Sequence, residues 1–310
     1  MYAPEFDYHK AGSVAEAIQL LGSHQDAKLL AGGHSLIPLM KLRLARPAVL
    51  VDIGHIADLK GISVDGETIH IGGLTTHHEI ASSTQLKNSN PMLVEVAAGI
   101  GDQAVRNRGT IGGNLVHADP ASDWGTVLIA LNASIDIQGP GGSRSVATED
   151  FFQGAFTTAL AENEVVTGVT VPVLSVHDHG HDHEHGHEHD HGSRDIHGQV
   201  GQSAKMAHPA SFYAVVGGAV VVTVADQRCT AARVAVGGLV PSPLRARSVE
   251  NALVGKELTP ENINAAVDHL ADDLGDDVIG DIFASAEFRR VVAPVEVKHA
   301  LFHATGMAHH

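Results

Sequence analysis

Cysteine is almost absent from this sequence of 310 residues, which contains only Cys229. A single cysteine cannot form a disulfide within the chain, and it cannot supply the thiolates of a Cys₄ zinc or iron–sulfur site. Such scarcity is typical of proteins in a reducing compartment. The composition therefore excludes a disulfide-stapled secreted domain and a chain that ligates its own iron–sulfur cluster.

Long apolar runs and an excess of positive charge are also missing. No run of 18 apolar residues occurs, and the N-terminus lacks a basic segment followed by an apolar one. We therefore expect neither a transmembrane segment nor a secretory signal. Lys and Arg number 20 against 36 Asp and Glu, a formal net charge of -16. Nucleic acids and anionic membranes attract cations, so neither is expected as the main partner. These features predict a cytoplasmic protein.

Aromatic residues make up only 4% of the chain, whereas glycine occurs 33 times. This composition favours turns and close backbone contacts over an aromatic cage for a ligand. The hydrophobic content of 44% is enough for a sizeable core. A chain of this length forms one large domain or two ordinary ones.

Short helical and strand patterns alternate irregularly along the chain. Ser13 and Thr76 are each followed three residues later by Glu, a capping-box pattern that begins a helix. Further helices are expected at 36–44, 91–100, 123–131, 246–254, 260–274 and 285–304, and strands at 28–31, 48–53, 67–71, 134–138, 165–171, 212–224 and 230–236. Pro294 should kink or interrupt the last helix. The absence of a βαβ rhythm favours an α+β fold over a doubly wound parallel sheet.

A histidine-rich stretch at 177–197 divides the chain into a first domain, 1–176, and a smaller C-terminal α+β domain, 198–310. Its low complexity and few apolar residues predict a disordered insertion or linker. Imidazole is a common ligand of Zn, Ni and Cu, but a flexible run lacks the fixed geometry of a dedicated site. We therefore expect adventitious metal binding by eight alternating histidines: His177, His179, His181, His183, His185, His187, His189 and His191.

Two turns that contain paired glycines carry the main functional signal. The first comprises Ala31, Gly32, Gly33, His34, Ser35 and Leu36, and the second Thr110, Ile111, Gly112, Gly113 and Asn114. Without Cβ atoms, the backbone can approach a ligand closely and direct successive N–H groups at one anion. Two such cradles in one domain suit a pyrophosphate, and hence a dinucleotide.

A simpler interpretation is that the glycine pairs only form tight turns, as glycine does in most loops. Neither turn matches the G-x-G-x-x-G fingerprint, and the lysine of a Walker A loop is missing. The glycines alone therefore leave both interpretations open.

The residues around the glycines closely resemble the two FAD-binding signatures of molybdenum hydroxylase flavoprotein subunits. The segments that carry the resemblance are AGGHSLIPLMKLRLARPAVLVDIG at 31–54 and RNRGTIGGNLVHADPASD at 106–123, and it continues at 69–83, 149–172, 205–222 and 232–255. It implies an FAD-binding domain of two α+β subdomains, of the vanillyl-alcohol oxidase type. It also implies a small C-terminal domain with an antiparallel sheet.

The resemblance implies roles for individual residues. Segments 31–36 and 110–114 would hold the FAD pyrophosphate. Asp123 matches a family aspartate near the flavin nucleotide, Val166 an aliphatic residue that packs on the ring system, and Lys205 a lysine near the isoalloxazine edge. A cation there would favour an anionic reduced flavin. The alternative for Lys205 is an ordinary solvated side chain.

The sequence also departs from the family pattern in places. The histidine tract has no family counterpart. His34 stands where many relatives carry Gln, although both can donate a hydrogen bond, and Ala207 stands where relatives often have a basic residue. Arg106 and Arg108 precede the second turn, where they would contribute to the phosphate field, meet an acidic partner, or remain solvated.

The resemblance implies a division of labour among subunits. In the family, a large molybdopterin subunit oxidises the substrate, and a small subunit with two [2Fe–2S] clusters relays electrons to the FAD subunit. We expect this chain to be that FAD subunit, without catalytic side chains of its own, in a dimer of three-subunit units. The run from Ala31 through RLARP looks most like the medium subunit of aerobic carbon monoxide dehydrogenase. Xanthine, aldehyde and N-heterocycle dehydrogenases are the alternatives.

Two hypotheses come from other classes of protein. A metal-binding protein or metallochaperone would use the histidine tract as its functional part, and it would bind Ni or Zn tightly without any flavin. A free-standing flavin oxidase would turn over its substrate without partner subunits. Deleting 177–197 separates the first from the FAD subunit, because flavin binding should survive the deletion.

Overall fold

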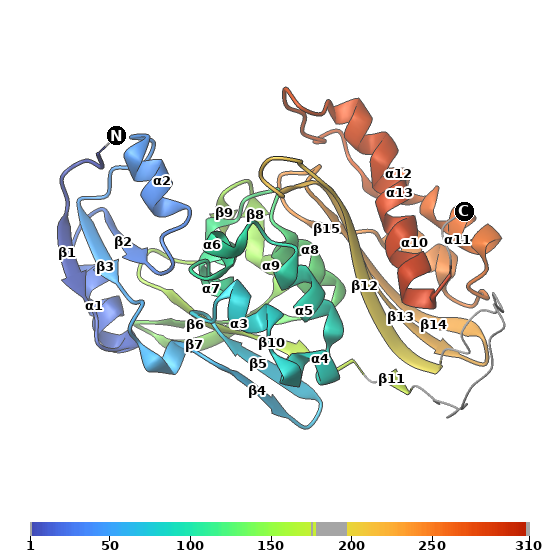
Figure 1. The fold of residues 1–310 in the computed structure, drawn as a ribbon, viewed down its shortest axis with the longest axis horizontal. Helices are drawn as coiled ribbons and strands as arrows, with labels where there is room; N and C mark the ends of the chain where they lie inside the picture. Colours follow the sequence, from blue (N-terminus) through green and yellow to red (C-terminus); the bar gives the residue numbers. More distant parts are fainter. Residues whose placement is uncertain (1, 175, 178–196, 308–310) are drawn as a thin grey trace.

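The computed structural model describes residues 2–174, 176–177 and 197–307. Figure 1 shows three bodies in a row, in the order of the sequence. Each body has its own cluster of buried apolar side chains. No helix among the described residues is long and apolar enough to cross a membrane. The mixed helices and sheets confirm the α+β prediction.

The first body is a three-stranded parallel sheet in the order β1-β3-β2. Ser13 begins α1 by accepting a hydrogen bond from the amide of Glu16, so the first capping pattern is confirmed. Ala17 turns from this helix into the core. The elements are β1 (Asp7–Lys10), α1 (Val14–Ser23), β2 (Ala27–Leu30), α2 (Leu36–Lys41), β3 (Val49–Asp52) and the short 3₁₀ helix η1 (Ala57–Leu59).

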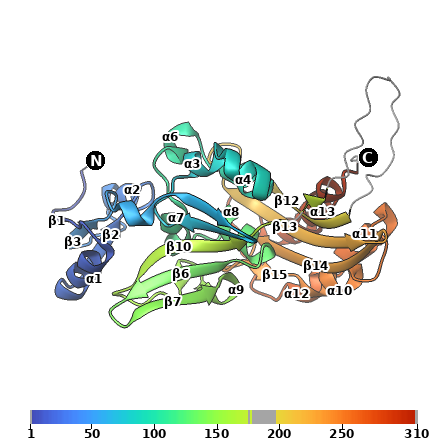
Figure 2. The ribbon, with the colours of Figure 1, turned by 90° about the horizontal axis from the view of Figure 1, so that it is seen from below.

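The second body is a five-stranded antiparallel sheet in the order β4-β5-β10-β6-β7, with short helices on one face (Figure 2). Trp124, Phe151 and Leu93 are among its fully buried side chains. The strands are β4 (Ile62–Asp65), β5 (Thr68–Gly72), β6 (Ser134–Gly139), β7 (Gly142–Ala147) and β10 (Val165–Pro172), and a hairpin of β8 (Phe152–Gly154) and β9 (Thr157–Thr158) stands apart. The helices are α3 (His77–Ala81), α4 (Thr84–Ser89), α5 (Pro91–Ala98), α6 (Gln103–Arg106), α7 (Ile111–His117), α8 (Asp123–Ala130) and α9 (Thr148–Phe151).

The third body is an antiparallel sheet whose strands neighbour one another in sequence order. Its strands are β11 (Val176–His177), β12 (His197–Ala207), β13 (Ala214–Ala225), β14 (Arg228–Gly237) and β15 (Leu244–Arg245). Helices α10 (Arg247–Leu253), α11 (Pro260–Val267), α12 (Leu270–Asp273) and α13 (Ala286–Thr305) follow. A Cβ added to Gly218 of β13 would lie 3.0 Å from the amide nitrogen of Val297, so α13 crosses the sheet closely.

Strand β13 is buried on both faces. Val221 belongs to the apolar cluster of the second body, whereas Val220 and Val222 belong to that of the third. Alternate side chains of a strand point to opposite faces, so one face of the sheet packs against the second body and the other against its own helices. This explains why the predicted strand reads as a continuous Val-rich run without polar alternation.

Three expectations are corrected by the structure. Residues 111–114 form the first turn of α7 rather than a loop. Of the kink or interruption expected at Pro294, the interruption does not occur: α13 continues through this residue, where the buried Ala293 and Val297 pack on either side and offset the lost hydrogen bond. The single helix expected at 260–274 is divided into α11 and α12.

Candidate functional site

The first glycine segment links β2 to α2 and leaves its amides available. Within the described chain, the backbone N–H groups of residues 32–36 donate to no acceptor, and the Ser35 side chain makes no capping bond. Gly33 has φ +74°, a left-handed conformation that glycine adopts readily. His34 lies with Nδ1 3.0 Å from the carbonyl oxygen of Gly32. Unused consecutive amides around a left-handed residue can bind an anion.

The second glycine segment uses its amides within the chain. The N–H of Ile111 donates to the carbonyl of Thr75 at 3.0 Å, and that of Gly112 to Gly73 at 2.9 Å. The N–H of Gly113 donates to the Thr110 hydroxyl at 3.1 Å. These three amides therefore bond within the chain, and the binding of the pyrophosphate by this segment stays a prediction. The segment instead offers side-chain donors, the Thr110 hydroxyl and the Asn114 amide.

The two glycine segments lie side by side, and each packs closely against the backbone of another part of the chain. A Cβ on Gly32 would lie 1.9 Å from the carbonyl oxygen of Arg108, and one on Gly112 would lie 2.6 Å from that of Gly73. Both positions need glycine because other segments of the chain pass there. A Cβ on Gly113 would lie 3.9 Å from the Cβ of Ala31. The structure thus brings together the two segments that the sequence singled out.

A buried His77–Trp124 pair supports the second segment, and sequence reasoning missed it. The indole Nε1–H of Trp124 donates to Nδ1 of His77 at 3.2 Å, and the backbone N–H of His77 donates to Gly109. Burial, and then the nearby Arg106, lower the pKa of His77 from 6.5 to about 4. The imidazole is therefore neutral at pH 7 and carries its proton on Nε2. No sequence signal distinguishes His77 from the adjacent His78.

Lys205 of β12 is bound by three acceptors from different elements. Its ammonium donates to the Asp123 carboxylate at 2.8 Å, the Gly99 carbonyl at 3.0 Å and the Phe212 carbonyl at 2.9 Å. Burial raises the pKa of Asp123, and the cation opposes that shift. Lys205 is therefore not an ordinary solvated lysine, and it ties the C-terminal sheet to α5 and α8.

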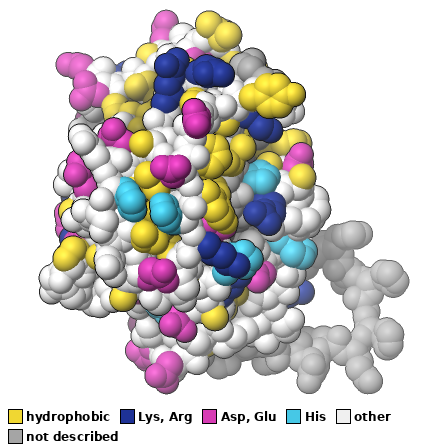
Figure 3. All heavy atoms as spheres, turned by 90° about the vertical axis from the view of Figure 1, so that its left-hand side faces the viewer, with side chains coloured by type: hydrophobic (Ala, Val, Ile, Leu, Met, Phe, Trp, Pro, Cys, Tyr) yellow, Lys and Arg dark blue, Asp and Glu magenta, His cyan; other side chains and the backbone are white. Residues whose placement is uncertain are grey.

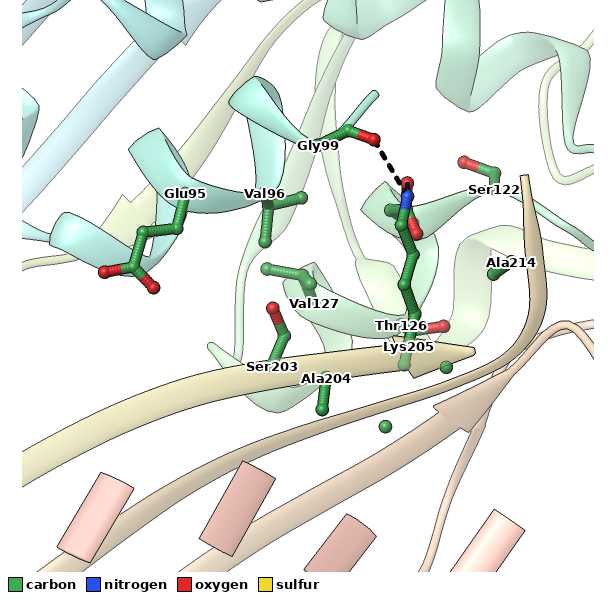
Figure 4. A pocket seen from close by; sticks show the side chains of 13 residues that line it. Glu95, Val96, Gly99, Ser122, Thr126, Val127, Ser203, Ala204, Lys205 and Ala214 are labelled. Carbon is green, nitrogen blue, oxygen red and sulfur yellow. Dashed lines mark hydrogen bonds and ion pairs between the residues drawn. The ribbon is translucent and has the colours of Figure 1, made fainter. Parts of the chain in front are cut away.

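A pocket of about 170 Å³ opens beside this ion pair (Figure 4). It lies between α5, α8, β12 and β13, and hydroxyl groups of Ser122, Thr126 and Ser203 line it. Figure 4 shows the Lys205 side chain extending from β12 toward Gly99. Ligand pockets usually have about 300–1,000 Å³, and no residue of the two glycine segments lines this one. The pocket alone therefore cannot hold a whole dinucleotide.

Val166 is buried on β10 and belongs to the core of the second body. Its carbonyl oxygen would lie 2.7 Å from a Cβ on Gly73, the residue whose own carbonyl accepts from Gly112. Val166 therefore lies near the second glycine segment through its backbone. Only 6% of its surface is exposed, so little of the side chain reaches a ligand without movement.

The predicted metal ligands fall almost entirely outside the described residues. Only the backbone of His177 is placed, as the last residue of β11. His179, His181, His183, His185, His187, His189 and His191 lie outside the described ranges. Among the residues that are described, no three or more His, Cys, Asp or Glu side chains gather as a metal site.

Comparison with known protein families identifies the first two bodies. Residues 4–174 match the family model of the FAD binding domain in molybdopterin dehydrogenase. The chain belongs to this family. Residues 204–304 match a second model, the CO dehydrogenase flavoprotein C-terminal domain. The resemblance read from the sequence is confirmed, and FAD is the cofactor of this flavoprotein component of an oxidoreductase.

Individual relatives match over nearly the whole chain. The carbon monoxide dehydrogenase medium chain of Hydrogenophaga pseudoflava is 36% identical over 304 residues, 97% of each chain. The nicotine 6-hydroxylase medium subunit of Paenarthrobacter nicotinovorans is 34% identical over 289 residues, 93% of each. A structure of carbon monoxide dehydrogenase from H. pseudoflava that lacks the Mo-pyranopterin moiety superposes with a TM-score of 0.88 at 37% identity, covering 99% of each chain.

The described residues fit FAD. Free amides at 32–36 suit its pyrophosphate oxygens, and the left-handed Gly33 gives that loop the shape of an anion-binding nest. Thr110 and Asn114 lie on the adjoining segment and can add hydrogen bonds. Lys205 and Asp123 place one cation and one carboxylate at the junction with the C-terminal sheet.

Proposed function

We propose that this chain transfers electrons through FAD within a molybdenum hydroxylase. It would take electrons from [2Fe–2S] clusters on a small partner subunit and pass them to an external acceptor. A large molybdopterin subunit would oxidise the substrate. The described residues include a single cysteine, Cys229, which is buried, and burial raises its pKa to about 11. It cannot ligate a cluster, so the clusters would lie on another chain.

The observation that carries the proposal is the free amide loop at 32–36 packed against the Thr110 segment. We propose that residues Ala31 to Leu36 bind the FAD pyrophosphate through the backbone, and that Thr110 and Asn114 add side-chain donors. Bound FAD supplies the electron chemistry, while the chain supplies binding, orientation and the local electric field. Asp123 and Lys205 would act together near the nucleotide and the ring edge, and Val166 would support the ring from the core.

We propose carbon monoxide as the substrate of the complete enzyme, and a dimer of heterotrimers as its assembly. Support for this substrate comes from the RLARP segment and from the carbon monoxide dehydrogenase medium chain that matches 97% of this chain. Medium subunits named for nicotine and glyceraldehyde are 34% and 36% identical, so purines, aldehydes and N-heterocycles are the competing substrates. Assays of the purified complex with each substrate class decide between them.

The direct test of the cofactor role is the visible spectrum of the purified chain, alone and in complex. We expect flavin bands near about 450 nm that reductant bleaches. Gly33→Val should abolish them, because its Cβ would lie 3.1 Å from Ile37 and valine is strained at φ +74°. Gly141→Val is the matched control, since nothing lies within 4 Å of its Cβ.

Two outcomes would count against this proposal. A wild-type chain that contains no flavin in either preparation, and takes up none when FAD is added, is not an FAD subunit. A Gly33→Val chain that folds and keeps full flavin content would show that the cofactor lies elsewhere in the molecule.

A further inference from the structure

The turn that follows α2 exposes leucines between cations. Leu42 is 55% exposed and Leu44 is 73% exposed. Lys41, Arg43 and Arg46 are exposed around them, and in the described part of the chain their side chains have no ion-pair or hydrogen-bond partner. We refer to residues 41–46 as the Leu42 turn.

The charge of the Leu42 turn is opposite to that of the whole chain. Acidic residues outnumber basic ones by 36 to 20, yet no Asp or Glu occurs between Asp26 and Asp52. That interval contains Lys28 and the three cations of the turn. Figure 3 shows dark-blue side chains beside yellow ones near the upper edge of the face that the first body presents, the end at which α2 lies in Figure 1.

The backbone conformation of the turn determines the exposure of Leu42 and Leu44. The amide of Leu42 donates to Pro38 at 2.9 Å, and that of Leu44 donates to Leu39 at 2.9 Å. Met40, within the same helix, is fully buried and anchors α2. Arg43 has φ +62°, a left-handed conformation that ends the helix and is uncommon for arginine. The turn is thus a preorganised structure that holds its leucines in solvent, not a frayed helix end.

We infer that the Leu42 turn is a docking surface for an acidic face of a partner subunit, in which carboxylates surround an apolar recess. This inference rests on the proposed function, because it assumes a multi-subunit enzyme. Exposed apolar anchors flanked by cations match the usual anatomy of a specific interface, an apolar centre with a polar rim.

The position of the turn places such a partner close to the cofactor loop. Helix α2 begins at Leu36, where the free-amide loop ends, and it finishes at Lys41, where the Leu42 turn begins. A helix of six residues is only about 9 Å long. A partner that docks on the turn would therefore lie next to the segment proposed to bind FAD.

A second copy of this chain, or the cofactor itself, would fit the Leu42 turn less well than an acidic partner face. Two copies that met through the same turn would bring three cations against three, which is unfavourable. FAD phosphates would engage the cations but would leave Leu42 and Leu44 in water. An acidic protein face with an apolar recess satisfies both kinds of side chain.

The test compares two variants of the full chain, each assembled with its partner subunits. The first replaces Leu42 and Leu44 by Ser, and the second replaces Lys41, Arg43 and Arg46 by Glu. The control replaces Lys60, Lys87 and Lys256 by Glu, which changes the net charge equally at exposed positions elsewhere. Association is measured by titrating the chain with its copurified partners at two salt concentrations, and flavin content is measured on each chain alone.

We expect both turn variants to weaken assembly at least about tenfold while they keep full flavin content, and the control to assemble normally. The wild-type affinity should fall with salt, and the charge variant should lose that dependence. Unchanged assembly of both variants overturns the inference. Loss of flavin from the isolated variants assigns the turn to the cofactor and also overturns it. A wild-type chain that binds no FAD at all contradicts the proposed function instead.

Discussion

Gly32 shows how a single residue can be required by the packing of the chain around a site. The space where its Cβ would lie is taken by the carbonyl oxygen of Arg108. The sequence correctly marked the glycine pairs as close approaches of backbone. It could not show that the second backbone belongs to the chain itself, because Arg108 is distant in sequence and only the fold brings it to Gly32.

Gly32→Ala should therefore destabilise the protein even without FAD. A Cβ that would lie 1.9 Å from a backbone oxygen forces the two segments apart. We expect the free energy of unfolding to fall by about 1–3 kcal/mol, as for other overpacked positions. Urea unfolding of the flavin-free chain measures it, with Gly141→Ala as the control. Equal stability of the two variants would contradict the packing role.

His77 should make stability depend on pH. Its pKa is lowered from 6.5 to about 4 in the folded protein, so the unfolded chain binds a proton more readily between these values. Its contribution is fully present above pH 6.5 and is lost as the pH falls toward 4, by about 3 kcal/mol. His77→Gln should flatten this part of the curve of unfolding free energy against pH. A variant whose pH profile parallels that of the wild type would refute this assignment.

At the scale of elements, the Lys205 side chain connects strand β12 to helices α5 and α8. The resemblance to a family indicated Lys205 and Asp123 separately, but nothing in the sequence shows that they form an ion pair 2.8 Å long. The carbonyl acceptors, Gly99 and Phe212, carry no sequence signal because any residue supplies a carbonyl. Backbone partners of this kind are determined by the fold alone.

Removing the two members of this ion pair should have unequal effects. Lys205→Met leaves the Asp123 carboxylate largely buried without a cation, and we expect a loss of about 3–5 kcal/mol in unfolding free energy. Asp123→Asn leaves Lys205 its two carbonyl acceptors and should cost less. A double-mutant cycle measured by thermal unfolding gives the coupling. A coupling energy near zero would show that the pair is solvent-screened.

The sequence predicts a glycine turn where the structure has the first turn of α7. Adjacent glycines have low helix propensity, and the pattern of Gly112 and Gly113 therefore favours a turn. Bonds to the carbonyls of Thr75 and Gly73 hold the segment in place, and these contacts are invisible in a local pattern. The helix at Ser13 was predicted correctly because its cap is local.

At the scale of the whole molecule, the histidine tract joins two strands that pair directly. Val176 lies opposite Gly198, and His177 lies opposite His197. Replacing residues 178–196 by Asn-Gly should keep this pairing, because a two-residue turn closes an antiparallel hairpin. We expect unchanged flavin content and lower Ni²⁺ binding, measured by absorption and titration calorimetry. Loss of flavin would place the tract in the cofactor site, and lost function together with lost metal would favour the metal-binding hypothesis.

Strand β13 contributes side chains to two hydrophobic cores, and this bears on how the chain evolved and how it folds. The family models divide the chain into segments 4–174 and 204–304. Yet Ala219 and Val221 complete the core of the preceding segment, while Val220 and Val222 complete that of their own. The segments can be distinct units of descent without being distinct units of folding. A C-terminal piece produced alone would expose an apolar sheet face to water, the condition that promotes aggregation.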